Sequence, residues 1–205
     1  MSETMLLALA TFCFVASITP GPNNMLLLAS GANFGFRRTL PHLMGVSIGF
    51  AVMLLAVGLG LGGLFTAYPA LYDALRVAGG AYLLWLAYRI ATASGFGDDT
   101  AAARPMSFLE AAAFQWVNPK GWATSLGAVT AFVAPAEFFA GVLIVTVVFS
   151  LVMLPCIASW AGFGVVLRRL LDRPWTLRVF NVTMAVFLVL SLYPMVKDLG
   201  SASSS

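Results

Sequence analysis

The chain has 205 residues, of which 60% are hydrophobic and only 9% are charged, and its mean hydropathy is +0.94. A soluble globular protein is about a quarter charged, because its surface must be hydrated. The composition therefore excludes a soluble domain and predicts an integral membrane protein. The net charge of +3 comes from basic residues scattered between apolar blocks, which excludes the basic stripe that a nucleic-acid-binding protein carries.

Apolar runs separated by turn residues predict six membrane spans of about 20 residues each. Runs such as residues 142–154 are apolar on every face, which indicates helices rather than strands of alternating polarity. We therefore expect a single all-α transmembrane domain over residues 1–205, with no soluble domain. The expected spans are residues 5–30, 43–64, 71–93, 108–133, 138–163 and 175–196.

The first span contains a polar interruption made of Thr19, Pro20, Gly21, Pro22, Asn23 and Asn24. Proline lacks a backbone donor and clashes with the preceding turn, and a glycine between two prolines favours unwinding. Backbone groups that are released in hydrocarbon cost several kcal/mol unless they find partners. Apolar sequence resumes at Met25, which indicates a break within the span rather than its end. We expect the six polar residues to contribute to a substrate site at this break.

The fourth span contains a second interruption, Asn118, Pro119, Lys120 and Gly121. Lys120 lies deep in the apolar run that starts near Phe108, where its ammonium group cannot easily reach the membrane surface. A cation at such a depth is costly and usually marks a transport pathway. Lys120 and the N-termini of two half-helices would together favour an anion such as a carboxylate. We therefore expect Asn118, Pro119 and Lys120 to complete the substrate site.

The two interruptions indicate an internal repeat. Each half of the chain begins with a broken helix and continues with two further spans, and the sequence LRV opens both the third and the sixth span, at residues 75–77 and 177–179. Three spans are an odd number, so the second half would be inverted relative to the first. We expect inverted repeats over roughly residues 1–95 and 105–200, an architecture that recurs in secondary transporters.

The basic residues are distributed unevenly between the two sides of the membrane. Loops one, three and five share a face and hold Arg37, Arg38, Arg89, Arg104, Arg168, Arg169, Arg173 and Arg178, whereas the other face holds only Arg76 and Lys197. Lysine and arginine concentrate in cytoplasmic loops. We therefore expect a multi-pass protein with both termini on the external side.

The predicted spans carry no acidic residue at their centres. Glu110 lies near the start of the fourth span, where we expect it at the membrane interface. A pocket for a dibasic substrate should offer a buried carboxylate to the second ammonium group, and this chain offers none. A small neutral amino acid fits better, with its carboxylate at Lys120 and its ammonium group at asparagine oxygens and released carbonyls.

The remaining residues of chemical interest are expected to be structural. Cys13 and Cys156 lie in apolar runs without metal-binding or redox spacing, so they indicate packing thiols, and no metal, cofactor or catalytic site is predicted. His42 follows Pro41 at a span boundary, where an interfacial position is favoured over a role as a proton relay.

Several glycines have the small-xxx-small spacing that lets membrane helices pack closely. The pairs are Gly45 with Gly49 and Gly58 with Gly62. A glycine-rich helix face would permit a homodimer without requiring one.

Five segments of the chain resemble the signature of LysE/RhtB-type amino-acid exporters. They are ITPGPNN at residues 18–24, GFR at 35–37, GVSIGF at 45–50, GGAYLLWLAY at 79–88 and WVNPK at 116–120. The resemblance covers essentially the whole chain, and the paired asparagines and the Gly49-Phe50 ending look most like the cysteine/O-acetylserine exporter branch. Many relatives carry an acidic residue where this chain has Phe50, so no carboxylate is evident for proton coupling.

The resemblance implies a secondary transporter in the bacterial inner membrane, driven by the proton-motive force. Its substrates would be small neutral amino acids or derivatives of the cysteine, O-acetylserine, homoserine or threonine kind. Three alternatives stay open: an exporter of lysine or arginine, an intramembrane thiol-redox protein that uses Cys13 and Cys156, and a channel or passive scaffold. A carrier would saturate and show counterflow, which a channel would not.

Overall fold

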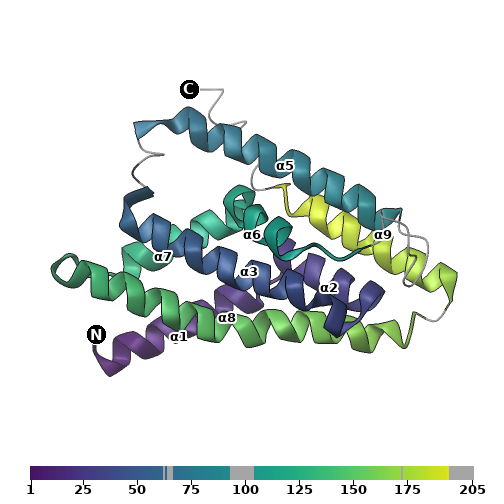
Figure 1. The fold of residues 1–205 in the computed structure, drawn as a ribbon, viewed down its shortest axis with the longest axis horizontal. Helices are drawn as coiled ribbons and strands as arrows, with labels where there is room; N and C mark the ends of the chain where they lie inside the picture. The colour runs from purple at the N-terminus through teal and green to yellow at the C-terminus, as the bar shows by residue number, and fades with distance from the viewer. Residues whose placement is uncertain (62, 64–66, 93–103, 172, 194–205) are drawn as a thin grey trace.

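The computed structural model describes residues 1–61, 63, 67–92, 104–171 and 173–193, and within this part of the chain the secondary structure is entirely helical (Figure 1). The predicted all-α class is therefore confirmed. The helices are α1 (Glu3–Ile18), α2 (Pro22–Phe34), α3 (Phe36–Ala56), α5 (Pro69–Ala91), α6 (Phe108–Val117), α7 (Pro119–Phe132), α8 (Phe138–Arg168) and α9 (Pro174–Leu190), with a π-helical turn at Val57–Leu61 and a short 3-10 turn at Pro135–Glu137.

Both predicted interruptions are real breaks between helices. The first separates α1 from α2, whose axes differ by 57°, and the second separates α6 from α7 at Asn118. The element order is thus a broken pair followed by two helices, and then the same again. Whether the second half is inverted relative to the first stays a prediction.

Two of the described helical segments, Phe36–Leu61 and Pro135–Arg168, are long and apolar enough to cross a membrane, and the bent pair α1–α2 makes a third. α8 alone has 31 residues, a length of about 47 Å, against a hydrocarbon core of about 30 Å. The expected count of six spans stays a prediction.

The second span starts earlier than expected, at Phe36 rather than at residue 43, so the predicted loop around Arg37, Arg38 and Pro41 is wrong. The physical reason lies at Gly35, whose φ of 81° is readily adopted only by glycine. This single residue ends α2, with its N–H donating to the Gly31 carbonyl (2.9 Å), and also caps the start of α3. No longer loop is needed.

Local sequence signals explain most helix starts. Proline occupies the first turn of α2, α5, α7 and α9, where its missing N–H would have no partner within the helix anyway. α6 begins with a capping box, in which Ser107 accepts from the Glu110 N–H and Glu110 accepts from the Ser107 N–H.

α2 lies at the centre of the molecule, and almost all of its residues are buried. One side packs into a core shared by α1, α3, α7 and α8, and the other packs against α5, α6 and α9. α5 and α9 lie side by side along one edge of the molecule, and α1 and α8 lie together on the opposite side (Figure 1). The outer surface is strongly apolar, with Leu109 75% exposed and Leu151 69% exposed, as a lipid-facing surface requires.

Glycines bring several helix backbones into direct contact. A Cβ atom on Gly31 would fall on the Ala161 carbonyl of α8, and one on Gly164 of α8 would fall on the Leu28 carbonyl of α2. Gly45 and Gly49 meet α6 in the same way, and Gly58 meets Val142. The predicted close-packing role is confirmed for Gly45, Gly49 and Gly58, while Gly62 lies outside the described residues. The Gly45–Gly49 face is used inside the chain, and a homodimer stays a prediction.

Candidate functional site

The two helix breaks meet in space, although about a hundred residues separate them in the sequence. The Lys120 Nζ atom, at the start of α7, donates a hydrogen bond to the Thr19 carbonyl, just past the end of α1 (2.7 Å). Lys120 is half-buried. The structure thus brings the predicted cation directly to the released backbone of the first break.

Three carbonyls at the end of α1, those of Ser17, Ile18 and Thr19, find side-chain donors. The Asn24 Nδ2 atom donates to the Ser17 and Thr19 carbonyls (2.8 and 2.9 Å), and the Trp160 indole of α8 donates to the Ile18 carbonyl (3.2 Å). A helix that is broken inside the hydrocarbon core needs such hydrogen-bond partners for its released backbone groups. Three elements, α2, α7 and α8, therefore hold the first break in place.

The second break is stabilised in the same manner. Asn118 caps α7 through its Oδ1 atom, which accepts from the Lys120 backbone N–H (3.2 Å), and the Trp122 indole donates to the released Trp116 carbonyl (2.8 Å). A reciprocal amide pair joins the two breaks: the Asn23 Nδ2 atom donates to Gln115 Oε1 (2.8 Å), and Gln115 Nε2 donates to Asn23 Oδ1 (3.2 Å).

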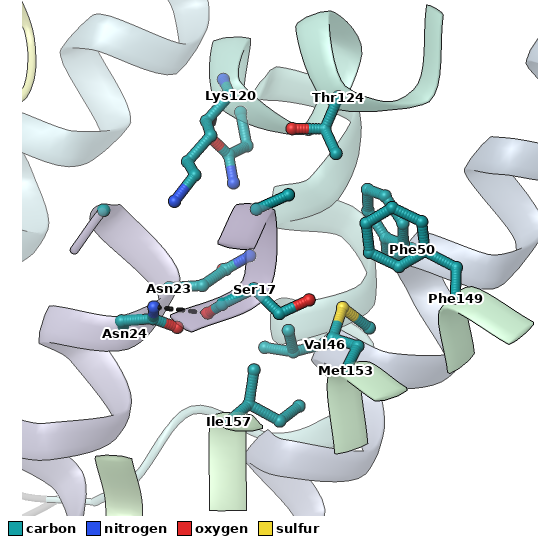
Figure 2. A pocket seen from close by; sticks show the side chains of 14 residues that line it. Ser17, Asn23, Asn24, Val46, Phe50, Lys120, Thr124, Phe149, Met153 and Ile157 are labelled. Atoms are coloured by element: carbon teal, nitrogen blue, oxygen red, sulfur yellow. Dashed lines mark hydrogen bonds between the residues drawn. The ribbon is translucent and has the colours of Figure 1, made fainter. Parts of the chain in front are cut away.

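A cavity lies between the breaks (Figure 2). Its volume of about 50 Å³ is room for roughly three or four water molecules. Asn23, Asn24 and Lys120 lie on one side of it, and the rings of Phe50 and Phe149 lie on the other (Figure 2). The two rings pack at a centroid distance of 4.8 Å. The cavity therefore offers one polar wall and one apolar wall. Its lining is completed by Ala16, Ser17, Gly21, Val46, Asn118, Gly121, Thr124, Met153 and Ile157.

Five of the nine residues predicted for the site line this cavity, namely Gly21, Asn23, Asn24, Asn118 and Lys120. The other four do not line it, but they shape the breaks. Thr19 supplies the carbonyl that Lys120 and Asn24 bind, Pro22 and Pro119 start the second half-helices, and Pro20 is exposed in the linker.

Gly21 contributes to the site through its missing side chain, whereas the sequence suggested that it favours unwinding of the helix. Its φ of −171° is ordinary extended backbone, so no special conformational freedom is used. A Cβ atom at this position would instead lie 2.8 Å from Lys120 Cδ and 3.1 Å from Lys120 Nζ. The missing side chain therefore makes room for the lysine.

The sequence did not identify Gln115, Ser17, Thr124 and Trp160 as parts of the site. Gln115 is completely buried in a predicted span, and a buried amide in a membrane helix is a signal that could have been used. Ser17 gave no such signal, since serine is common in membrane helices. Its Oγ atom lines the cavity and has no hydrogen-bond partner among the described residues.

The charge at the site is positive. None of the described residues that are buried and polar is Asp or Glu. α2 begins at Gly21 without a side-chain cap among the described residues, so its N-terminal partial charge adds to that of Lys120. The arrangement can bind a carboxylate, and it offers no acidic partner for a second ammonium group.

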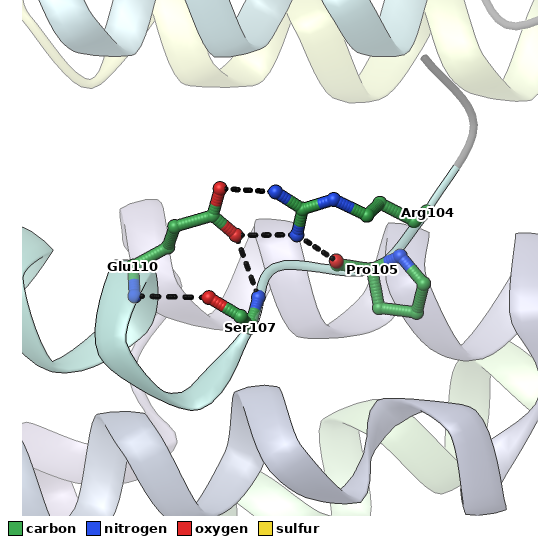
Figure 3. Close-up of polar contacts among 4 residues, drawn as sticks. All are labelled: Arg104, Pro105, Ser107 and Glu110. Carbon is green, nitrogen blue, oxygen red and sulfur yellow. Dashed lines mark hydrogen bonds and ion pairs between the residues drawn. The ribbon is translucent and has the colours of Figure 1, made fainter. Parts of the chain in front are cut away.

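Glu110 pairs with Arg104 at the start of α6 (Figure 3), and its expected location at the membrane interface stays a prediction. The two guanidinium nitrogens of Arg104 donate to the two carboxylate oxygens at 2.7 and 2.6 Å, and one of them also donates to the Pro105 carbonyl (3.3 Å). The hydrogen bonds and the charge of Glu110 raise the pKa of Arg104 above its usual value. The pair fixes the segment that leads into α6.

His42 lies within α3, which starts earlier than expected, and it is only 1% exposed. Its expected position at the membrane interface stays a prediction. Cys13 and Cys156 are buried free thiols, as predicted for packing residues.

Comparisons with known proteins find relatives along nearly the whole chain. The family model described as LysE type translocator matches residues 14–192. The chain is 36% identical to the cysteine/O-acetylserine efflux proteins of Escherichia coli strain K12 and of Shigella sonnei strain Ss046, over 92% of this chain and 96% of each relative. No solved structure matches the chain.

Proposed function

The chain belongs to the LysE family of translocators, and on this premise we propose that it exports small neutral amino acids or their derivatives from the cytoplasm. The substrates would be of the cysteine, O-acetylserine, homoserine or threonine kind. The observation that carries the proposal is the cavity between the two helix breaks, with Lys120 and an unpaired serine hydroxyl on its wall and no acidic residue among those that line it.

Lys120 would bind the substrate carboxylate. In the present conformation its ammonium group donates to a neutral acceptor, the Thr19 carbonyl. A carboxylate accepts a stronger, charge-assisted hydrogen bond, so it can displace the carbonyl. Binding of substrate would then release the contact between α1 and α7, which gives the substrate a direct effect on the conformation of the carrier.

The substrate ammonium group would lie toward Asn24 and Ser17. Because two carbonyls fix the Asn24 nitrogen, the Asn24 oxygen is the atom left to accept from an ammonium group. The Ser17 Oγ atom is a second acceptor. The short side chain of the substrate would then face Phe50, Phe149 and Met153 on the apolar wall.

The same lining disfavours lysine and arginine as substrates. Their second cation would have to leave water without a carboxylate to pair with, which costs several kcal/mol. The limited volume also favours a small side chain.

Transport would follow alternating access between two inverted halves, residues 1–95 and 105–200, in the bacterial inner membrane with both termini outside. The proton-motive force would drive it. Inverted repeats with broken helices at the substrate site are a recurring design for such carriers.

Counterflow in proteoliposomes tests the proposal. Vesicles are loaded with one unlabelled solute, and uptake of labelled cysteine or O-acetylserine is followed. Small neutral amino acids inside should accelerate uptake, whereas lysine and arginine should not. Cysteamine, which has the thiol and amine of cysteine but no carboxylate, should also fail if Lys120 binds the carboxylate.

The outcomes separate the alternatives. Acceleration by lysine or arginine would contradict the argument from the missing acidic residue and favour the basic-amino-acid exporter. Acceleration by cysteamine would contradict only the proposal that Lys120 binds the substrate carboxylate. Uptake that neither saturates nor responds to any loaded solute would point to a channel, and unchanged transport after Cys13→Ser with Cys156→Ser would exclude a thiol-redox mechanism.

A further inference from the structure

A second cavity of about 70 Å³ lies away from the helix breaks, on the side of the molecule that carries the arginines of loops one and three. It is bounded by α2, α3, α5 and the segment that leads into α6. Its polar and charged lining consists of Ser30, Asn33, His42, Arg89 and Arg104.

His42 differs from the other buried polar groups of this cavity. The Ser30 and Thr39 hydroxyls are hydrogen-bonded to each other (2.9 Å), and Asn33 pairs with Asn181 of α9 (2.9 Å). Both ring nitrogens of His42, in contrast, have no partner within the described protein. Leaving a buried polar group unpaired is destabilising, so a residue that serves packing alone would not be histidine.

Helix α3 connects His42 to the substrate site. Val46 and Phe50 follow His42 at intervals of four residues, which places the three side chains along one face of the helix, and Val46 and Phe50 line the first cavity. A rotation or tilt of α3 would therefore change the surroundings of His42 and of the substrate together.

The charged and titratable groups around His42 come from several elements. They are Arg37 and Arg38, which are exposed at the start of α3 itself, Tyr82 and Arg89 of α5, Arg104 and Glu110 at the start of α6, and Arg168 of α8, which lies beside Gly35. α2 contributes no ionisable side chain. Glu110 is engaged by Arg104 through both carboxylate oxygens. Imidazole is the side chain that ordinarily exchanges a proton near neutral pH, and no other described side chain of this kind is buried here.

We propose that His42 binds the proton that drives export, and that the second cavity is the site where it exchanges this proton with water on the arginine-rich side of the membrane. The inference rests on the proposed export function. A ring nitrogen with a free lone pair takes up a proton when movement of α3 exposes His42 to the external side. It releases the same proton into the second cavity when α3 returns, while the substrate moves in the opposite direction.

The test compares exchange with proton-driven accumulation in the same proteoliposomes. Counterflow of labelled O-acetylserine without a pH gradient reports binding and translocation, and accumulation into vesicles that are acidic inside reports coupling to protons. His42→Gln keeps a polar side chain of similar size but binds no proton. It should retain counterflow within about twofold and lose accumulation by more than about tenfold.

Ser150→Ala is the control, because it removes a polar side chain that lines neither cavity and bonds, among the described residues, to the Thr146 carbonyl of its own helix. It should retain both activities. If His42→Gln retains accumulation, or loses counterflow as strongly as accumulation, the proposal is overturned. A wild-type protein that shows counterflow but no proton-driven accumulation would overturn the proton site and leave the export function standing, whereas absence of counterflow would contradict the export function itself.

A second measurement does not depend on the folding of a variant. His42 is the single histidine of the chain, so protein labelled with ¹⁵N-histidine gives the signals of this ring alone. If proton and substrate are coupled through His42, linkage requires that substrate shift the pH titration of the ring. Titration curves that coincide with and without O-acetylserine would overturn the proposal.

Discussion

At the residue scale, the site depends on the hydrogen bond from Lys120 to the Thr19 carbonyl, which joins the two breaks beside the Asn23–Gln115 pair, and on the glycine that makes room for Lys120. The sequence predicted Lys120 and the asparagines, because polar residues beside proline in an apolar run are conspicuous. It could not predict the use of Gly21, since nothing in the sequence shows that Lys120 approaches it from another helix.

Lys120→Ala should abolish export while leaving membrane insertion intact, because it removes the cation that binds the carboxylate. A hydrogen bond to a charged group contributes about 1.5–3 kcal/mol, so the apparent affinity in counterflow should fall by at least about tenfold. Gly21→Ala should cause a smaller loss, since the added Cβ displaces the end of Lys120 rather than backbone. The double variant should be no worse than Lys120→Ala alone.

Gly127→Ala is the control for these variants. Like Gly21→Ala, it adds a methyl group, in this case on α7. Its Cβ would lie 3.7 Å from a ring carbon of Phe12, which is an ordinary contact. It should transport normally. Additive losses for Gly21→Ala and Lys120→Ala would show that Gly21 acts independently of the lysine.

At the scale of the elements, the helix breaks and most helix starts follow from local sequence, since proline and capping residues act within one turn. Which helices pair does not follow, because the pairing depends on buried side chains far apart in the sequence. Two reciprocal amide pairs illustrate this: Asn23 with Gln115 joins α2 to α6, and Asn33 with Asn181 joins α2 to α9.

The pair of Asn33 and Asn181 should couple α2 and α9 energetically. Asn33→Leu and Asn181→Leu should each lower the free energy of unfolding by about 1–3 kcal/mol, because each removes both hydrogen bonds between the two buried amides. The loss in the free energy of unfolding of the double variant should be smaller than the sum of the two single losses, by roughly 0.6 kcal/mol or more. Thermal unfolding in detergent measures all three.

Thr183→Ala serves as the reference for this cycle. Thr183 is on the same helix, is exposed, and bonds only to the Val179 carbonyl of its own helix among the described residues. It should change the free energy of unfolding by less than about 0.5 kcal/mol. Losses at Asn33 and Asn181 that simply add would contradict a direct coupling.

At the scale of the whole molecule, composition alone predicted a helical membrane protein, because a surface with so few charges cannot be hydrated. The start of the second span was misplaced, since the turn at Gly35 needs one residue where a loop was expected. The earlier start places His42 within α3, where its side chain is buried in the protein.

The orientation predicted from the arginines can be tested at the two ends of α8. Ala136 and Arg173 are both exposed, just before and shortly after this helix. In a chain with Cys13→Ser and Cys156→Ser, the variant Ala136→Cys should react with a membrane-impermeant maleimide in intact cells. The variant Arg173→Cys should react only after the cells are permeabilised, because its loop is expected on the cytoplasmic side.

The parent chain without cysteine should remain unlabelled under both conditions. The reverse pattern, with position 173 labelled in intact cells, would contradict the expected orientation and place the arginine-rich face outside.

The glycine contacts between α2 and α8 determine which part of the protein can act as a hinge. Gly31 and Gly164 place each helix against a backbone carbonyl of the other, so the two helices cannot slide past one another without a steric clash. They should therefore move as a rigid body. The bend of 57° between α1 and α2 would then be the hinge about which α1 moves, and in the proposed mechanism the substrate would release this hinge by replacing the Thr19 carbonyl at Lys120.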